Sequence, residues 1–231
     1  MVAIQREIIA IDVESVDDYP LYTAEEKLAD AIIHAVGIVA SLFACGWLWG
    51  IGFANFHTGL GIAVALYAVL VIALFMCSCA YHHTPVETLR PFLRRLDQSA
   101  IFFKIAGTYT PLVFIIGTTF GFSVLAFVWS CAVLGAAFKM FTGERLSRYT
   151  VSMYLALSWA SLLLIWPMYH ALPGLSLTLI ALGGITYTTG VYFHQASGMH
   201  FNNAIWHAFV VAGSAMHYTA IGIAASAFLT A

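Results

Sequence analysis

No Asp, Glu, Lys or Arg occurs in residues 149–231, so the last third of the chain has no formal charge apart from its end. Over all 231 residues, only 9% are charged and 61% are hydrophobic. A soluble domain carries about 25% charged residues, so this chain has too few to cover a soluble surface. The composition excludes a soluble globular enzyme, a disordered protein and a conventional nucleic-acid binder.

Seven apolar runs are long enough to cross a bilayer, which takes about 20 residues per helix. We expect the spans at 31–52, 58–80, 99–117, 120–138, 151–169, 175–193 and 204–227. The turn-forming sequence Gly-Thr-Thr-Phe-Gly at 117–121 divides the third span from the fourth, and Pro173-Gly174 divides the fifth from the sixth. The sequence therefore predicts an all-α integral membrane protein, with a seven-helix bundle over residues 31–231.

The first 30 residues are rich in acidic side chains and lack the basic start and apolar stretch of a signal peptide. Their acids are Glu7, Asp12, Glu14, Asp17, Asp18, Glu25, Glu26 and Asp30. We interpret residues 1–30 as a solvated acidic tail. Thr23 followed by Glu26 fits a capping box, which predicts a short surface helix over 23–28.

The distribution of basic residues predicts the orientation of the bundle. All nine fall in the tail, between the second and third spans, or between the fourth and fifth, with Lys104 expected just inside the third helix. They are Arg6, Lys27, Arg90, Arg94, Arg95, Lys104, Lys139, Arg145 and Arg148. By the positive-inside rule, the N-terminus is cytoplasmic and the C-terminus lies outside.

Polar side chains from several predicted helices should meet at the cytoplasmic end, where intramembrane ionisable groups indicate a functional site. Ser78 and His82 are four residues apart, as are Asn203 and His207, so each pair shares a helix face. Two imidazoles and a carboxylate are ordinary zinc ligands, so we predict a metal site of His82, His207 and Asp97. Asp97 would bind the metal directly or act as a general base, and Ser78 would orient an imidazole or a water. The structural alternative is hydrogen-bonded helix packing or, for Asp97 and Asn203, a helix cap.

The remaining candidate ligands have simpler interpretations. His83, His194 and His200 are expected to be solvated residues at the membrane interface. The cysteines all lie inside apolar runs, so we expect free thiols rather than disulfides. They are Cys45, Cys77, Cys79 and Cys131.

Several blocks of sequence resemble the hemolysin III family. They are "CAYHH" directly after Ser78, "RRLDQSAIFFKIAGTYTP" at 94–111 and "NAIWHAFVVAGSAMHY" at 203–218, and "EEKLADAIIHAVG" at 25–37 fits the first helix of that family. The resemblance extends over about residues 24–225. It implies seven helices with a cytoplasmic N-terminus in a bacterial inner membrane, and a grouping with the progestin and adiponectin receptors and, distantly, the alkaline ceramidases.

In this wider group, Ser-x-x-x-His in the second helix, Asp in the third and His-x-x-x-His in the seventh form a zinc site. By resemblance Ser78, His82, Asp97 and His207 match this pattern, whereas Asn203 stands in place of the first His of the final pair. Asn is a poor zinc ligand because its carbonyl oxygen is neutral and hard. The candidates to replace it are His34 and His217.

The predicted site and the resemblance together suggest a zinc-dependent enzyme that hydrolyses an amide or ester bond of a membrane lipid. Two other classes stay open. One is a non-catalytic, receptor-like regulator of membrane homeostasis with a structural metal. The other is a pore-forming protein, although no charged ring lines the outer half of the bundle. The two-His, one-carboxylate ligand set permits Zn, Fe or Mn, and the sequence leaves the lipid and the oligomeric state open.

Overall fold

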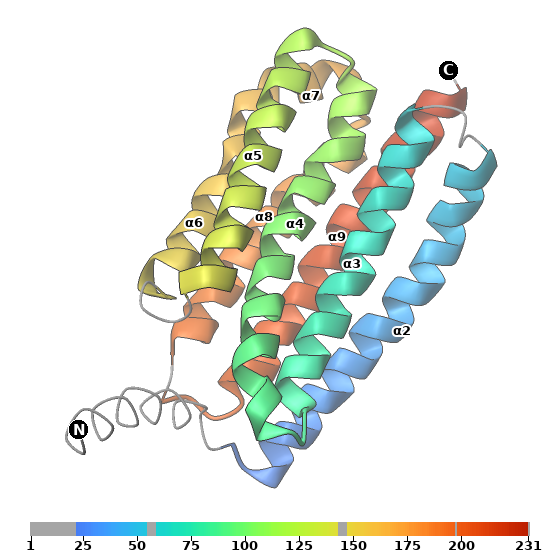
Figure 1. Ribbon diagram of the computed structural model, residues 1–231. Coiled ribbons are helices and arrows are strands. Elements are labelled where there is room, and N and C mark those ends of the chain that lie inside the picture. The colour runs from blue at the N-terminus through green and yellow to red at the C-terminus, as the bar shows by residue number, and fades with distance from the viewer. Residues whose placement is uncertain (1–21, 55–58, 143–146, 197, 231) are drawn as a thin grey trace.

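The computed structural model describes residues 22–54, 59–142, 147–196 and 198–230, and every regular element in these segments is helical (Figure 1). The helices are α2 (Ala24–Ala54), α3 (Gly59–His83), η1 (Glu87–Leu89), α4 (Arg90–Ile116), α5 (Thr119–Thr142), α6 (Ser147–Trp159), η3 (Ala160–Leu164), α7 (Ile165–Ala171), α8 (Gly174–Gln195) and α9 (Asn202–Thr230). Seven spans are long and apolar enough to cross a membrane, which confirms the predicted fold class.

The first helix begins earlier than predicted, at Ala24 instead of residue 31. The capping box is present, because the Thr23 N–H donates to Glu26 Oε2 (2.9 Å) and the Glu26 N–H donates to Thr23 Oγ1 (3.3 Å). It starts the long membrane helix instead of a separate surface helix. Asp30 consequently lies two turns inside α2, where only 4% of its surface is exposed.

The predicted break between the third and fourth spans is confirmed. Helix α4 ends at Ile116, and Gly117 adopts a left-handed φ of 66° while its N–H donates to the Val113 carbonyl. Glycine adopts this conformation without steric cost because it has no Cβ.

The fifth span is one membrane crossing, Tyr149–Ala171, but it is interrupted by the 3-10 segment η3. Pro167 in α7 has no N–H to donate to the carbonyl four residues earlier, which belongs to Leu163 in η3. The interruption therefore lies where the α-helical hydrogen bond is missing.

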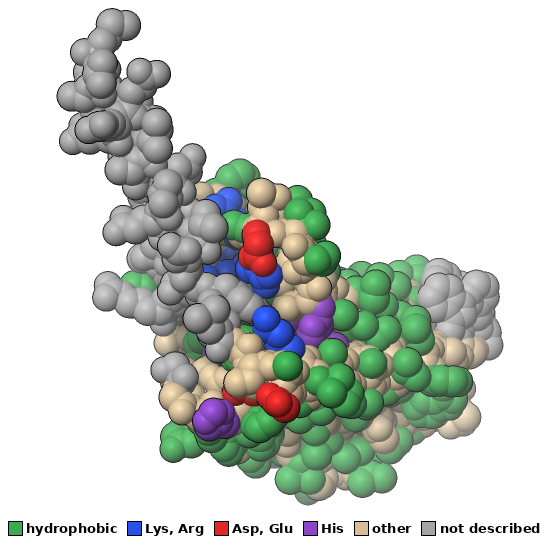
Figure 2. Space-filling model, turned by 90° about the horizontal axis from the view of Figure 1, so that it is seen from below, with side chains coloured by type: hydrophobic (Ala, Val, Ile, Leu, Met, Phe, Trp, Pro, Cys, Tyr) green, Lys and Arg blue, Asp and Glu red, His purple; other side chains and the backbone are tan. Residues whose placement is uncertain are grey.

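Helix α9 is central to the bundle and packs against α2, α3, α4 and α8 (Figure 1). The largest side chains of the core include Tyr67, Phe102 and Ile221. Large apolar side chains such as Phe43 and Phe141 are exposed on the flanks, as expected of a surface that faces lipid. Figure 2 shows the end where α2 begins, where basic, acidic and His side chains gather beside the apolar flank. All four cysteines are free, as predicted.

Lys104 is not at the edge of its helix. Because α4 begins at Arg90, Lys104 lies about midway along the helix and is 5% exposed. Its ammonium donates to the Tyr187 hydroxyl (2.6 Å), which bonds to the Ser214 hydroxyl (2.6 Å). Lys104 is therefore an interior residue and does not count as a loop charge. The orientation of the bundle stays a prediction that rests on the other basic residues.

Gly37 sets how closely α2 approaches its neighbours. A Cβ at this position would lie 2.9 Å from Phe75 Cδ1 and 3.1 Å from Val211 Cγ2, on α3 and α9. We expect Gly37→Leu to lower the free energy of unfolding by about 1–3 kcal/mol, because overpacking pushes the helices apart. Thermal unfolding in detergent measures this. Gly46→Leu on the same helix is the control, because a Cβ there meets nothing within 4 Å, and an equal loss in both variants would contradict the prediction.

Candidate metal centre

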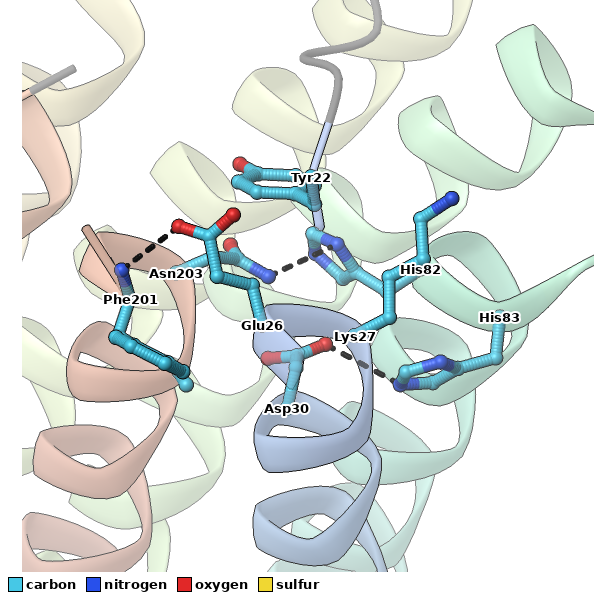
Figure 3. A pocket seen from close by; sticks show the side chains of 9 residues that line it. Tyr22, Glu26, Lys27, Asp30, His82, His83, Phe201 and Asn203 are labelled. Atoms are coloured by element: carbon cyan, nitrogen blue, oxygen red, sulfur yellow. Dashed lines mark hydrogen bonds and ion pairs between the residues drawn. The ribbon is translucent and has the colours of Figure 1, made fainter. Parts of the chain in front are cut away.

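Four helices supply polar side chains to one end of the bundle, and Figure 3 shows those of Asp30, His82, His83 and Asn203. Helix α2 supplies Asp30 and His34, α3 supplies Ser78, His82 and His83, α4 supplies Asp97, and α9 supplies Asn203 and His207. Although these residues are far apart in the sequence, they lie together in space. They meet at one end of the bundle, as the sequence predicts.

The Asp30 carboxylate is the hub of this cluster, because three imidazoles surround it. Its Oδ1 accepts a hydrogen bond from His207 Nδ1 at 2.6 Å. Its Oδ2 lies 3.3 Å from His34 Nδ1 and 3.2 Å from His83 Nε2. One ligand atom each from Asp30, His34 and His83 lie within 4.8 Å of one another, which forms a possible metal-binding triad.

The Ser78 hydroxyl links two of the imidazoles on their far sides. Ser78 Oγ lies 3.1 Å from His34 Nε2 and 3.3 Å from His207 Nε2. A hydroxyl donates only one hydrogen bond, so it donates to one ring and accepts from the other. His207 Nδ1 carries a proton because it bonds to a carboxylate, so a neutral His207 accepts from Ser78. In that arrangement His34 Nε2–H donates to Ser78.

In this arrangement His34 Nδ1 has no proton to donate. If Nε2 of a neutral His34 carries the proton, Nδ1 has a lone pair that is directed at the Asp30 backbone carbonyl (2.9 Å) and at Oδ2. Two acceptors repel unless a cation lies between them. The network is satisfied by a second proton on His34 or on His207, and a cation held by His34 Nδ1, Asp30 Oδ2 and His83 Nε2 would satisfy it as well.

The residues present fit a metal ion. His83 Nε2 is buried and has no hydrogen-bond partner of good geometry, although it faces the carboxylate. One carboxylate and two imidazoles, without a thiolate, suit Zn and also Fe or Mn. His207 lies on the opposite carboxylate oxygen, where it orients the ligand as outer-shell partners of metal sites do.

His82 and Asn203 form a pair beside the triad. Asn203 Nδ2 donates to His82 Nδ1 at 3.3 Å, and the His82 ring lies 4.7 Å from the His207 ring between centroids (Figure 3). Asn203 therefore contacts His82 through its amide nitrogen, which is not a metal ligand. The possible metal-binding group among the described residues is Asp30, His34 and His83, and the ligand set of His82, His207 and Asp97 stays a prediction.

Asp97, on α4, belongs to the same polar end of the bundle. Its carboxyl group is near Ser78, His34 and Arg94. Tyr22 lines the cavity that adjoins Asp30 and His83 (Figure 3). Burial raises the pKa of the Tyr22 hydroxyl, and the Asp30 and Glu26 carboxylates raise it further, so Tyr22 remains a neutral hydroxyl.

Two residues of the triad were not among the predicted ligands. Asp30 was placed with the solvated acids of the tail, and His83 was expected to be a solvated interface residue, but its side chain is only 25% exposed. The capping box at Thr23 could have identified Asp30 as a site residue. A helix that starts at Thr23 carries Asp30 and His34 on one face, because they are four residues apart. Of the two proposed substitutes for Asn203, His34 is in the cluster, whereas His217 bonds to the Ile180 carbonyl elsewhere in the bundle.

The fold and this cluster define a polytopic seven-helix membrane protein with an intramembrane His–carboxylate site. The family model described as "Haemolysin-III related" matches residues 22–218, so the chain belongs to the haemolysin III family. This confirms the resemblance noted in the sequence.

Several known proteins are similar to this chain over most of their length. The chain is 35% identical to "Hemolysin-3 homolog" of Bacillus subtilis (strain 168) over 199 residues, covering 84% of this chain and 92% of the relative. It is 36% identical to "Hemolysin-3" of Bacillus cereus over 200 residues, covering 84% and 89%. The human "Monocyte to macrophage differentiation factor" is 27% identical over 207 residues, covering 86% and 84%.

Asp30→Asn tests the hub directly. The variant keeps the shape of the side chain but removes the negative charge, so we expect zinc affinity to fall at least about tenfold. Competition titration against a chromogenic chelator measures this. Glu87→Gln, which removes a carboxylate from the exposed ion pair with Arg90 (2.7 Å), is the matched control. Equal affinity in Asp30→Asn and the wild type would exclude Asp30 from the site.

Proposed function

We propose that the protein is a metal-dependent hydrolase, with zinc as the metal, that cleaves an amide or ester bond of a membrane lipid. The observation that carries this proposal is the gathering of Asp30 Oδ2, His34 Nδ1 and His83 Nε2 at the polar end of a membrane bundle. Zinc in such a site supplies a Lewis acid that activates water and polarises a carbonyl group.

The other residues of the cluster have roles that their positions support. His207 Nδ1 holds one carboxylate oxygen of Asp30, so the other oxygen stays directed at the triad. Ser78 connects His34 and His207 and fixes the orientation of both rings. Asp97, which interacts with Ser78, is the carboxylate in this cluster that is not part of the triad. It is therefore the candidate general base, which would take a proton from the attacking water and pass it to the leaving group.

The position of the site favours a lipid substrate. The cluster is buried at the end of the bundle where α2 begins, and at that end charged and His side chains gather beside the apolar flank (Figure 2). The ester or amide linkage of a lipid resides at such a boundary. With the predicted orientation, this is the inner leaflet of the membrane. The relatives from Bacillus support a bacterial plasma membrane as the location.

A non-catalytic regulator with a structural metal is the second candidate. The observation that favours it is the cavity above Asp30, which has a volume of only about 10 Å³. Such a cavity holds about one water and no lipid headgroup. The name Hemolysin-3 of the relative from Bacillus cereus raises pore formation as a further candidate, which leakage of dye-loaded liposomes tests.

Comparison of His83→Ala with His82→Ala decides which imidazole binds the metal. We expect about one zinc per chain in the purified wild type, loss of zinc in His83→Ala, and retention in His82→Ala. Elemental mass spectrometry of detergent-purified protein, prepared without chelators, measures this. His170→Ala is the control for loss of an exposed His away from the cluster.

The opposite result, loss of zinc in His82→Ala alone, would support the ligand set implied by the wider group. A wild type free of metal would exclude the hydrolase. If zinc is present, Asp97→Asn should retain it but lose most lipid hydrolysis, about 10²–10⁴-fold for loss of a general base. Release of fatty acid from defined lipids is the readout.

Asn203→His restores the residue that the wider group has at this position. Asn203 lines the same cavity as Asp30 and His83, so an added imidazole should raise zinc affinity by about tenfold or more. Asn202→His is the matched control, because the Asn202 side chain instead bonds to the Ala196 carbonyl. Unchanged affinity in Asn203→His would place residue 203 outside the metal's reach.

A further inference from the structure

The cavity above Asp30 is lined by two segments that are far apart in the sequence. Tyr22 and Glu26 at the start of α2 lie on one side, and Phe201 in the turn before α9 lies on the other (Figure 3). Asp30 and His83 line the same cavity. With a volume of about 10 Å³, it has room for about one water. A lipid headgroup therefore reaches the cluster from this side only if the two segments separate.

The Glu26 side chain joins the two segments. Its Oε2 accepts the Thr23 N–H within the capping box (2.9 Å), while its Oε1 accepts the Phe201 N–H (2.9 Å). The exposed His200 imidazole lies 3.7 Å from the same Oε1. Glu26 is only 9% exposed, so this charge-assisted hydrogen bond is sheltered from water.

The turn that Glu26 holds is strained. Phe201 has a φ of 60°, and it is the one described non-glycine residue with positive φ. An aromatic residue adopts this left-handed conformation at a cost in free energy, so the surrounding contacts must maintain it. Release of the Phe201 N–H would remove one contact that maintains it.

We propose that Glu26 and Phe201 form a latch that closes the aqueous entrance of the metal centre. With the latch closed, the start of α2 and the turn before α9 cover Asp30 and narrow the cavity that His83 lines. With the latch open, the strained turn relaxes and the cluster is accessible to metal ions and to polar headgroups. The role of the latch in admitting a substrate rests on the proposed function, whereas its control of access to the cavity does not.

Modification of His82 by diethyl pyrocarbonate tests access without any metal. Peptide mass spectrometry of the full-length protein in detergent gives the rate of modification of His82, with His170 as an internal reference at a distance from the cavity. We expect Glu26→Ala to accelerate modification of His82 by about 10–100-fold, since a hydrogen bond to a charged group is lost. The rate at His170 should not change.

Thr23→Ala is the matched control, because it removes the Thr23 hydroxyl from the capping box but leaves the bond from Glu26 to Phe201. We expect wild-type access in this variant. Equal acceleration in Thr23→Ala and Glu26→Ala would show that only the helix cap matters and would overturn the latch. No acceleration in Glu26→Ala would overturn it as well.

Zinc exchange then separates a latch from a merely structural role. If Glu26 gates entry, Glu26→Ala accelerates zinc uptake and zinc release by the same factor and leaves the affinity unchanged. A fall in affinity with no faster uptake would contradict gating. If the wild type binds no zinc, the proposed function fails, while the His82 modification rates still decide the latch.

Discussion

The buried Asp30 carboxylate is the interaction on which the polar end of this bundle depends. It lies two turns inside α2 and is in contact with imidazoles from α2, α3 and α9. A buried carboxylate is costly unless its oxygens are paired, and these imidazoles provide that pairing. The same contacts hold α2, the least enclosed of the three helices, against the rest of the bundle. Ligand geometry and helix packing are therefore coupled at this one side chain.

Much of the fold follows from the sequence, because a bilayer imposes a length on each apolar run and turn residues separate the runs. Gly117 is an example, since a left-handed cap needs a glycine. The ends of the helices were less predictable. Charged residues favour solvent, so the sequence predicts Asp30 in the tail and a third helix that starts only after Arg90, Arg94 and Arg95. In the structure, α2 starts at Ala24 and α4 at Arg90. In this bundle, Asp30 and Lys104 lie inside the packed helices, where each has a polar partner.

Part of the site was also visible in the sequence. The spacing of Ser78 with His82, and of Asn203 with His207, placed them on shared helix faces at one end of the bundle, and the structure brings these faces together. The sequence does not show which of the adjacent residues His82 and His83 joins the triad. Neighbouring residues on a helix point about 100° apart, so the partner on another helix decides which ring enters the triad. That partner, Asp30, is known only once the helices are packed.

Asn203 accounts for how this chain arranges its two adjacent imidazoles. An amide nitrogen donates a hydrogen bond and does not bind metal, so Asn203 engages His82 Nδ1 as a neutral partner. His83, at the next position of α3, faces Oδ2 of Asp30 at 3.2 Å. His34 meets the same oxygen from within α2, one turn after Asp30. Asn203, at the position where the wider group has His, thus lies beside the possible metal-binding triad of Asp30, His34 and His83 and contacts its neighbour His82.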